Sequence, residues 1–329
     1  MKKPVRIAVD AAGIDGGIAL AAAAISQALS CDENLELVVF ADQDAADGIA
    51  RTLSDPRVQV ETCDHSLAAD LNAAAAIRRG NGSTMWLALE QLRAGQLDAL
   101  VSGGSTGALM ALSRHILGTL PGVERPALMA AIPTMTRPVW MLDLGANIHV
   151  DARRLLEFAH LGQVACQVLE GKAPRIGLLN VGTEPGKGPD LIREAARLID
   201  ENPELNYAGF VEADQVFSGA VDLVVCDGFA GNVLLKSAEG AIKLLFASLR
   251  SEFQGSLCGL IAKSRLQRVH DSLDPARHNG APMLGVRGTV IKSHGGTCSR
   301  GFARAIELAA LEARHDLVGR LERQLLASY

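Results

Sequence analysis

The chain has 329 residues, of which 48% are hydrophobic and 21% charged, and its formal net charge is −5. This composition is that of a globular protein with a substantial core, and the acidic balance argues against a nucleic-acid-binding protein. The longest apolar runs are shorter than the roughly 20 residues of a membrane span. The six cysteines form no metal-binding pair, so we expect a cytoplasmic protein without a metal site.

Short β-branched runs alternate with helical segments along most of the chain. The expected strands, in chain order, are VRIAVDA (5–11), LELVVF (35–40), RVQVE (57–61), LDALVSG (97–103), PVWMLDLG (138–145), RIGLLNVG (175–182), LNYAGFV (205–211), VDLVVCDG (221–228) and GTVIKS (288–293). The clearest helical segments are STMWLALEQLRAG (83–95), ARRLLEFAHLGQVACQVLEG (152–171) and DLIREAARLIDE (190–201). Strands separated by helices predict parallel β-α-β units with helices on both faces of the sheet. Because no linker or repeat divides the chain, we expect one α/β domain over 1–329.

The segment 240–275 departs from this alternation. It begins as a long helix, and its second half carries apolar residues at Leu257, Leu260 and Ile261, interleaved with basic residues at Lys263, Arg265 and Arg268. This pattern predicts an amphipathic helical protrusion. Such a helix can lie on a membrane surface or bind an acidic partner, and a dimer-interface or core helix with a solvated basic face has the same pattern.

Five polar, glycine-containing loops follow expected strands. They are SGGSTGA (102–108), DLGANIHVD (143–151), NVGTEPGKGPD (180–190), CDGFAGNVLLK (226–236) and KSHGGTCS (292–299). Ligands of parallel sheets gather beyond the carboxyl ends of the strands. We therefore expect these loops to share one edge of the sheet and to form the functional site.

The first loop is suited to phosphate. Ser102, Ser105 and Thr106 offer hydroxyl groups, and glycines such as Gly107 allow close approach of the backbone at a helix start. An ordinary strand-to-helix turn with a Ser or Thr cap has the same sequence. Both interpretations stay open at this level.

The other loops supply charged and amide side chains. Lys187 lies in GTEPGKG, whose spacing is not that of a P-loop, although a lysine there can still reach a phosphate oxygen. Asp227 ends an apolar strand, and Asn232 follows it as a candidate helix cap or hydrogen-bond donor. His294 lies between a serine and a glycine, where an imidazole can titrate near neutrality.

The runs SGGSTGALMA, LDLGAN, GLLNVGTEPGKGPDL, VDLVVCDGFAGNVLLKSAEG and NGAPMLGVRGTVIKSHG, in this order over about residues 83–312, resemble the PlsX family of acyl-[acyl carrier protein]:phosphate acyltransferases. The resemblance implies a fold like that of isopropylmalate dehydrogenase and phosphate acetyltransferase. It also implies acyl transfer to inorganic phosphate for phosphatidic acid synthesis, without cofactor. The implied partners are acyl carrier protein, a second copy of the chain, the cytoplasmic membrane surface and a glycerol-3-phosphate acyltransferase.

The resemblance also implies roles for individual residues. The implied catalytic residues are Lys187, Asp227, Asn232 and His294, and the implied phosphate- or substrate-binding residues are Asp10, Asp15, Ser102, Ser105, Thr106, Gly107, Asn147 and Lys236. The implied membrane or carrier-protein contacts are Leu257, Leu260, Ile261, Lys263, Arg265 and Arg268. The chain departs from the family in the loop DAAGIDGG (10–17), where Ile14 replaces a glycine, and at Ser105, which replaces an asparagine.

Two other functions fit the sequence. A phosphate acetyltransferase-like enzyme would use acyl-CoA and have no need of the protrusion at 240–275. A non-catalytic paralogue would bind acyl carrier protein or the membrane, and only the altered 10–17 loop favours it. A metal-dependent hydroxyacid dehydrogenase is set aside, because the chain has no nicotinamide-binding fingerprint.

Overall fold

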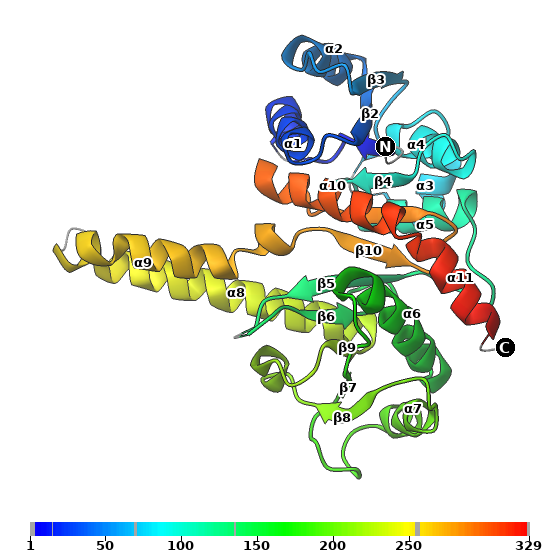
Figure 1. The fold of residues 1–329 in the computed structure, drawn as a ribbon, viewed down its shortest axis with the longest axis vertical. Helices are drawn as coiled ribbons and strands as arrows, with labels where there is room; N and C mark the ends of the chain where they lie inside the picture. Colours follow the sequence, from blue (N-terminus) through cyan, green and yellow to red (C-terminus); the bar gives the residue numbers. More distant parts are fainter. Residues whose placement is uncertain (1–3, 15, 69–70, 135, 254–256, 328–329) are drawn as a thin grey trace.

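The computed structural model describes residues 4–14, 16–68, 71–134, 136–253 and 257–327 (Figure 1). Its strands are β1 (Val5–Asp10), β2 (Leu35–Asp42), β3 (Val58–Cys63), β4 (Ala99–Ser102), β5 (Ala127–Ile132), β6 (Val139–Leu142), β7 (Ile176–Leu179), β8 (Tyr207–Val211), β9 (Leu223–Val225), β10 (Ala281–Leu284) and β11 (Thr289–Lys292). Its helices are α1 (Gly17–Cys31), α2 (Gln43–Thr52), α3 (Ala73–Arg79), α4 (Thr84–Arg93), α5 (Thr106–Ile116), α6 (Ala152–Glu170), α7 (Asp190–Asp200), α8 (Gly228–Phe253), α9 (Leu257–Leu273), α10 (Ser299–Arg314) and α11 (Leu317–Ala327), with short 3-10 helices at Gln215–Ser218 and Pro275–His278.

The described strands form one sheet in the order β3-β2-β1-β4-β11-β10-β5-β6-β9-β7-β8. Seven of the ten pairings are parallel, and the three antiparallel ones join β11 to β10, β10 to β5 and β5 to β6. The prediction of a parallel-rich α/β sheet is confirmed. The central strands β4, β6 and β9 are buried throughout, as parallel strands covered on both faces require, whereas the outer strands β3 and β8 are partly exposed.

Two strands near the centre of the sheet, β5 and β10, were missed by the sequence pattern. The sequence of β5 is ALMAAI, which consists mainly of residues that favour helices. The strand β10 has four residues and contains a proline, which weakens any strand prediction. Because both strands pair antiparallel, β4 and β11 run opposite to β6, β7 and β9.

The expectation that five loops share one edge is therefore wrong. The loops after β4 and β11 lie at one edge of the sheet, here called the first edge. The loops after β6, β7 and β9 lie at the opposite, second edge. The helix α8 begins at the second edge and runs back past the sheet to the first (Figure 1).

Helices cover both faces of the sheet, which gives three layers. In β1, Ile7 and Val9 pack in the cluster that includes α1 and α10, whereas Ala8 packs on the other face with α4 and α5. In β6, Trp140 and Leu142 likewise pack with α6, α7 and α11 on one face of the sheet. This alternation follows from the two-residue period of strands.

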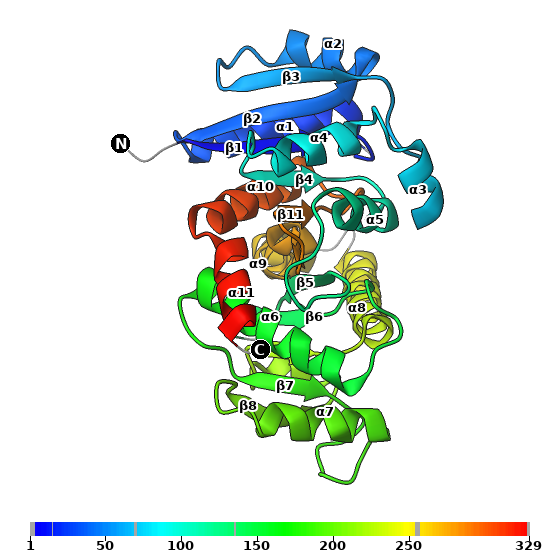
Figure 2. The same cartoon turned by 90° about the vertical axis from the view of Figure 1, so that its right-hand side faces the viewer.

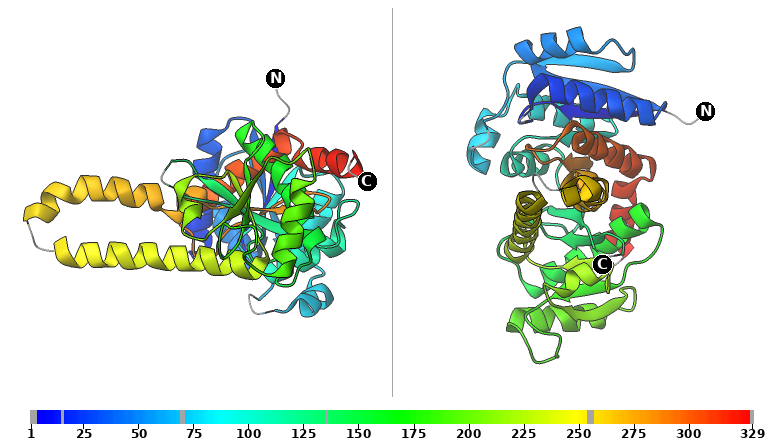
Figure 3. Two further views of the ribbon diagram at one scale, coloured as in Figure 1. Left: turned by 90° about the horizontal axis from the view of Figure 1, so that it is seen from below. Right: turned by 90° about the vertical axis from the view of Figure 1, so that its left-hand side faces the viewer.

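The protrusion predicted near 240–275 is confirmed as a hairpin of α8 and α9, which extends well beyond the sheet (Figures 1 and 3). The helix α8 starts earlier than expected, at Gly228. The ring of Phe246 packs edge-on against that of His270, with centroids 4.8 Å apart, and joins the two helices. Within the described ranges, each helix is too short or too polar to cross a bilayer.

Candidate active site

The start of α5 presents free backbone donors at the first edge. Ser105 is its N-cap residue but makes no side-chain cap. In the described part of the chain, the N–H groups of Thr106, Gly107 and Ala108 have no acceptor. A Cβ at Gly107 would meet nothing within 4 Å. An anion can therefore approach these N–H groups directly, at the positive end of the helix.

A buried hydroxyl–carboxylate pair lies directly before this loop. Asp10 ends β1 and Ser102 ends the neighbouring β4, and both are fully buried. The Ser102 hydroxyl donates to Asp10 Oδ2 at 2.6 Å and accepts the N–H of Gly104 at 3.1 Å. Burial raises the pKa of Asp10, and the hydrogen bond from Ser102 opposes that rise. The pair fixes the first turn of the 102–107 loop.

The unusual residue in the 10–17 loop belongs to the core. Ile14 is 7% exposed and packs with the cluster around α1 and α10. Its side chain lies against Gly103, where a Cβ would come within 2.9 Å of Ile14 Cγ1. The departure from the family pattern thus braces the 102–107 loop through apolar contact. Asp15, which the resemblance implies in substrate binding, lies outside the described residues.

His294 and Lys236 approach each other at the first edge. The Nδ1 atom of His294 accepts the N–H of Gly296 at 3.1 Å, so the neutral imidazole carries its proton on Nε2. Partial burial lowers the pKa of His294, and the positive charge of Lys236 on α8 lowers it further. The Lys236 ammonium pairs with Glu239 at 2.9 Å. At neutral pH His294 is therefore a neutral Nε2–H donor.

A second polar cluster lies at the second edge. The Asp143 carboxylate is fully buried and accepts the N–H groups of Leu128 at 2.9 Å, Ala146 at 3.3 Å and Asn147 at 2.6 Å. The Asn147 amide donates both its hydrogens, one to Asp143 Oδ2 and one to the carbonyl of Pro126, each at 3.0 Å. Asn147 therefore has no amide hydrogen left for a substrate, and its observed role is to hold the loop.

The helix cap at the second edge is Asp227. Its Oδ1 accepts the N–H of Ala230 at 2.9 Å, which caps the start of α8. Asn232, considered as a cap from the sequence, lies inside the helix because α8 begins four residues earlier. Its side chain is exposed beside the 143–150 loop, where a Cβ at Gly145 would lie 3.7 Å from Asn232 Cβ.

Lys187 lies in the exposed loop between β7 and α7. The Asn180 amide holds this loop by donating to the carbonyls of Gly182 and Lys187, each at 3.1 Å. Figures 1 and 2 place the loop at one end of the long axis of the molecule, well below β4 and β11. Direct contact between Lys187 and an anion at α5 of the same chain is not supported by this placement.

The basic residues of the protrusion, Lys263, Arg265 and Arg268, are exposed on α9. Leu257, Leu260 and Ile261 belong to the same helix, but their side chains lie outside those that the structure describes.

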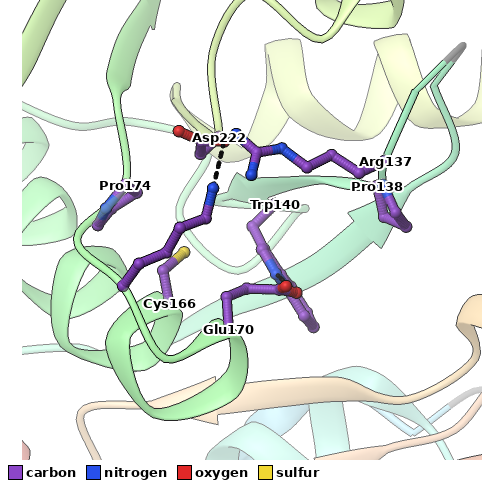
Figure 4. Close-up of a pocket in the computed structure, with 8 residues that line it drawn as sticks. Arg137, Pro138, Trp140, Cys166, Glu170, Pro174 and Asp222 are labelled. Atoms are coloured by element: carbon purple, nitrogen blue, oxygen red, sulfur yellow. Dashed lines mark hydrogen bonds and ion pairs between the residues drawn. The ribbon is translucent and has the colours of Figure 1, made fainter.

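A small pocket elsewhere contains none of the predicted residues (Figure 4). It is lined by Trp140, Glu170 and the residues around Asp222. Arg137, Lys172 and Arg175 pair with the Asp222 carboxylate. These ion pairs join the amino ends of β6, β7 and β9 and have a bracing role.

Lys292 was missed by sequence reasoning. It ends β11 directly beside Ser102 of β4, and its ammonium donates to the carbonyl of Gly103 at 3.4 Å. Burial lowers the pKa of Lys292 to about 8, while attraction to Asp10 acts in the opposite direction. The available signal was its position at the end of an apolar central strand, where a lysine side chain has buried neighbours on both sides.

Comparison with known proteins shows the family. A model described as "Fatty acid synthesis protein" matches residues 5–320. The phosphate acyltransferase of Alcanivorax borkumensis is 44% identical over 321 residues, which cover 95% of each chain. That of Alkalilimnicola ehrlichii is 41% identical over 336 residues, which cover 99% of this chain and 97% of the relative.

A solved phosphotransacetylase from Streptococcus pyogenes has a TM-score of 0.62 and 19% identity and covers 94% of each chain. At that identity the likeness concerns the fold alone, and it confirms the predicted fold class. Together, the full-length relatives and the family match show that the chain belongs to the fatty acid synthesis protein family, which is the PlsX family, and that it is an acyltransferase.

Proposed function

We propose that this chain transfers an acyl group from acyl-[acyl carrier protein] to inorganic phosphate and so forms an acyl phosphate for phospholipid synthesis. Membership of the family supports acyl transfer to phosphate, and the sequence resemblance supports the carrier protein as donor. The main structural support for a phosphate site is the start of α5, which has no side-chain cap and lies beside the Asp10–Ser102 pair.

The reaction requires positioning more than acid–base chemistry. A phosphate oxygen attacks the thioester carbonyl carbon and forms a carbon–oxygen bond. The carbon–sulfur bond then breaks, and its electron pair leaves with sulfur. A thiol with a pKa of about 8.5 is an adequate leaving group, and the thiolate takes a proton from solvent. The protein supplies orientation and stabilises the oxyanion.

In this proposal the first edge binds both reactants. Ser105, Thr106 and Gly107 hold phosphate at the start of α5, and Ser102 and Asp10 fix the loop beneath them. The Nε2–H of His294 donates to the thioester oxygen, and Lys236 adds positive charge nearby. A neutral His294 favours hydrogen bonding over protonation of the leaving sulfur.

The proposal for the second edge is different. Asp227, Asn147 and Asn232 shape the loop from which α8 starts and thereby place the helix that carries Lys236. Lys187 keeps its proposed role in phosphate binding on the motif match alone. Its loop reaches a phosphate at α5 only from another copy of the chain or after a large movement.

We also propose that the chain forms a cytoplasmic homodimer with peripheral membrane contact through the hairpin. Leu244 and Leu245 on α8 are 69% and 50% exposed, which supports a covered face in the assembled protein. The basic side chains of α9 suit the anionic headgroups of a membrane or an acidic carrier protein. A glycerol-3-phosphate acyltransferase would receive the product there.

The test mixes the purified chain with palmitoyl-acyl carrier protein and phosphate and follows release of the free carrier thiol. We expect release that depends on phosphate and is slower with acetyl-CoA as donor. Faster turnover of acetyl-CoA would instead favour a phosphate acetyltransferase. Carrier binding without release at any chain length would identify a non-catalytic paralogue.

A further inference from the structure

Lys292 contacts the loop at the start of α5 from the adjacent strand. It pairs with Ser102 in the register of β11 and β4. Its ammonium donates to the carbonyl of Gly103 at 3.4 Å and to the carbonyl of Ser293. The main chain around it is fixed, because the N–H of Ser293 donates to the carbonyl of Ser102 at 2.9 Å. The Asn279 amide also donates to the Ser293 hydroxyl at 2.7 Å.

The charge of this ammonium is incompletely compensated. Its two contacts are carbonyl dipoles, and across the described ranges it forms no ion pair with a carboxylate. The Asp10 carboxylate, on β1, attracts the Lys292 ammonium without direct contact. This carboxylate accepts the Ser102 hydroxyl instead. A mostly buried ammonium without an anionic partner is costly to maintain. Its contact with Gly103, in the loop that leads into the free N–H groups of α5, is therefore informative.

We propose that Lys292 is a phosphate-binding residue whose ammonium holds the substrate phosphate against the free N–H groups of Thr106, Gly107 and Ala108. This inference rests on the proposed function, because it takes inorganic phosphate as the ligand. A lysine provides the compact positive charge that a helix start alone lacks. Low local polarity strengthens the attraction.

The first test measures the KM for inorganic phosphate in the carrier-thiol assay. Lys292→Met keeps most of the side-chain volume without the charge, and we expect it to raise this KM by about 10- to 100-fold. The KM for acyl-acyl carrier protein should stay within about twofold of the wild-type value. Lys172→Met is the matched control, because Lys172 lies in the Asp222 cluster away from the site, and it should leave both constants unchanged.

The second test measures how the KM for phosphate depends on pH. If Lys292 had only a structural role, its protonation state would not change phosphate affinity. The ammonium loses its proton as pH rises through about 8, so the wild-type KM for phosphate should increase above that pH. Asp10 and His294 are the ionisable groups that interact electrostatically with it, and His294 is already neutral there. Lys292→Arg stays charged and should remove the increase.

Three outcomes separate this inference from the proposed function. If Lys292→Met turns over with an unchanged KM for phosphate, the inference is wrong and the function stands. If the wild-type chain shows no phosphate-dependent release, the function fails. If Lys292→Met does not fold, titration of the wild-type chain with phosphate at pH 7 and pH 9.5 decides, and equal affinity at both overturns the inference.

Discussion

Asp10 and Asp143 are both fully buried carboxylates at strand ends, yet their surroundings differ. Asp143 accepts three backbone N–H groups and one amide hydrogen from its own edge of the sheet. Asp10 accepts the Ser102 hydroxyl and the N–H of Ala12, and it attracts Lys292, whose charge has no direct anionic partner among the described residues. A closed set of hydrogen bonds stabilises a loop. An open set beside a helix start leaves binding capacity for a ligand.

The largest expected effect is on stability at the second edge. Asp143→Ala leaves several buried donors without an acceptor and should lower the free energy of unfolding by about 3–5 kcal/mol. Denaturant unfolding measures this loss. Asp227→Ala, which removes only a helix cap, should cost about 1 kcal/mol. If Asp10→Ala destabilises the chain as much as Asp143→Ala while turnover is preserved, the two carboxylates have the same structural role and the proposed difference between them is wrong.

At the first edge we expect a loss of turnover with little loss of stability. His294→Ala removes one donor to the developing oxyanion and should lower kcat by about 100-fold. Steady-state kinetics on palmitoyl-acyl carrier protein measures the change. His149→Ala is the matched control, because His149 is exposed at the second edge. An equal loss in both variants would contradict the assignment of chemistry to the first edge.

The pH dependence of turnover sharpens the same comparison. The pKa of His294 lies below its usual value of 6.5, so the neutral ring, whose Nδ1 accepts the N–H of Gly296 and so orients Nε2–H, persists at pH 6.5. As pH falls further, Nδ1 takes a proton, this contact is lost and the donor is no longer held in place. We expect an acid limb in kcat/KM below pH 6.5 for the wild-type chain. His294→Gln keeps an N–H donor without titrating and should lack that limb. A limb of the same midpoint in His294→Gln would assign it to another group.

The smallest expected effect concerns Lys187. Because its loop lies at the far end of the long axis from α5, Lys187→Ala should lower kcat by less than tenfold. A loss as large as that of His294→Ala would show that the loop reaches the site. Mixing Lys187→Ala and His294→Ala chains would then reveal whether it does so from a second subunit, because mixed dimers would regain activity.

The sequence predicted the fold class and the hairpin well, since long periodic segments determine both. It missed β5 and β10, whose short Ala-, Met- and Pro-containing runs lack a strand pattern. As a result, the five polar loops were all predicted at one edge of the sheet, whereas the structure divides them between two opposite edges. Glycine spacing and side-chain chemistry predicted the 102–108 loop and His294 as parts of the site, and these stay predictions. The role of Asn147 was not predictable, because only three-dimensional contacts show that both amide hydrogens are used. Lys292 was missed although a signal was present, because it directly follows the apolar residues of a central strand.

The length of α8 determines how far the site lies from any surface that the hairpin contacts. From Lys243, one of the charges that act on His294, α8 continues ten residues to Phe253, which is about 15 Å at 1.5 Å per residue. The hairpin is thus a spacer. It keeps any flat surface that contacts its far end at a constant distance from the imidazole of His294. An acyl phosphate made at the first edge must cross that gap before it enters such a surface. The helix length, more than the chemistry of the site, would then set how far an apolar product travels through water.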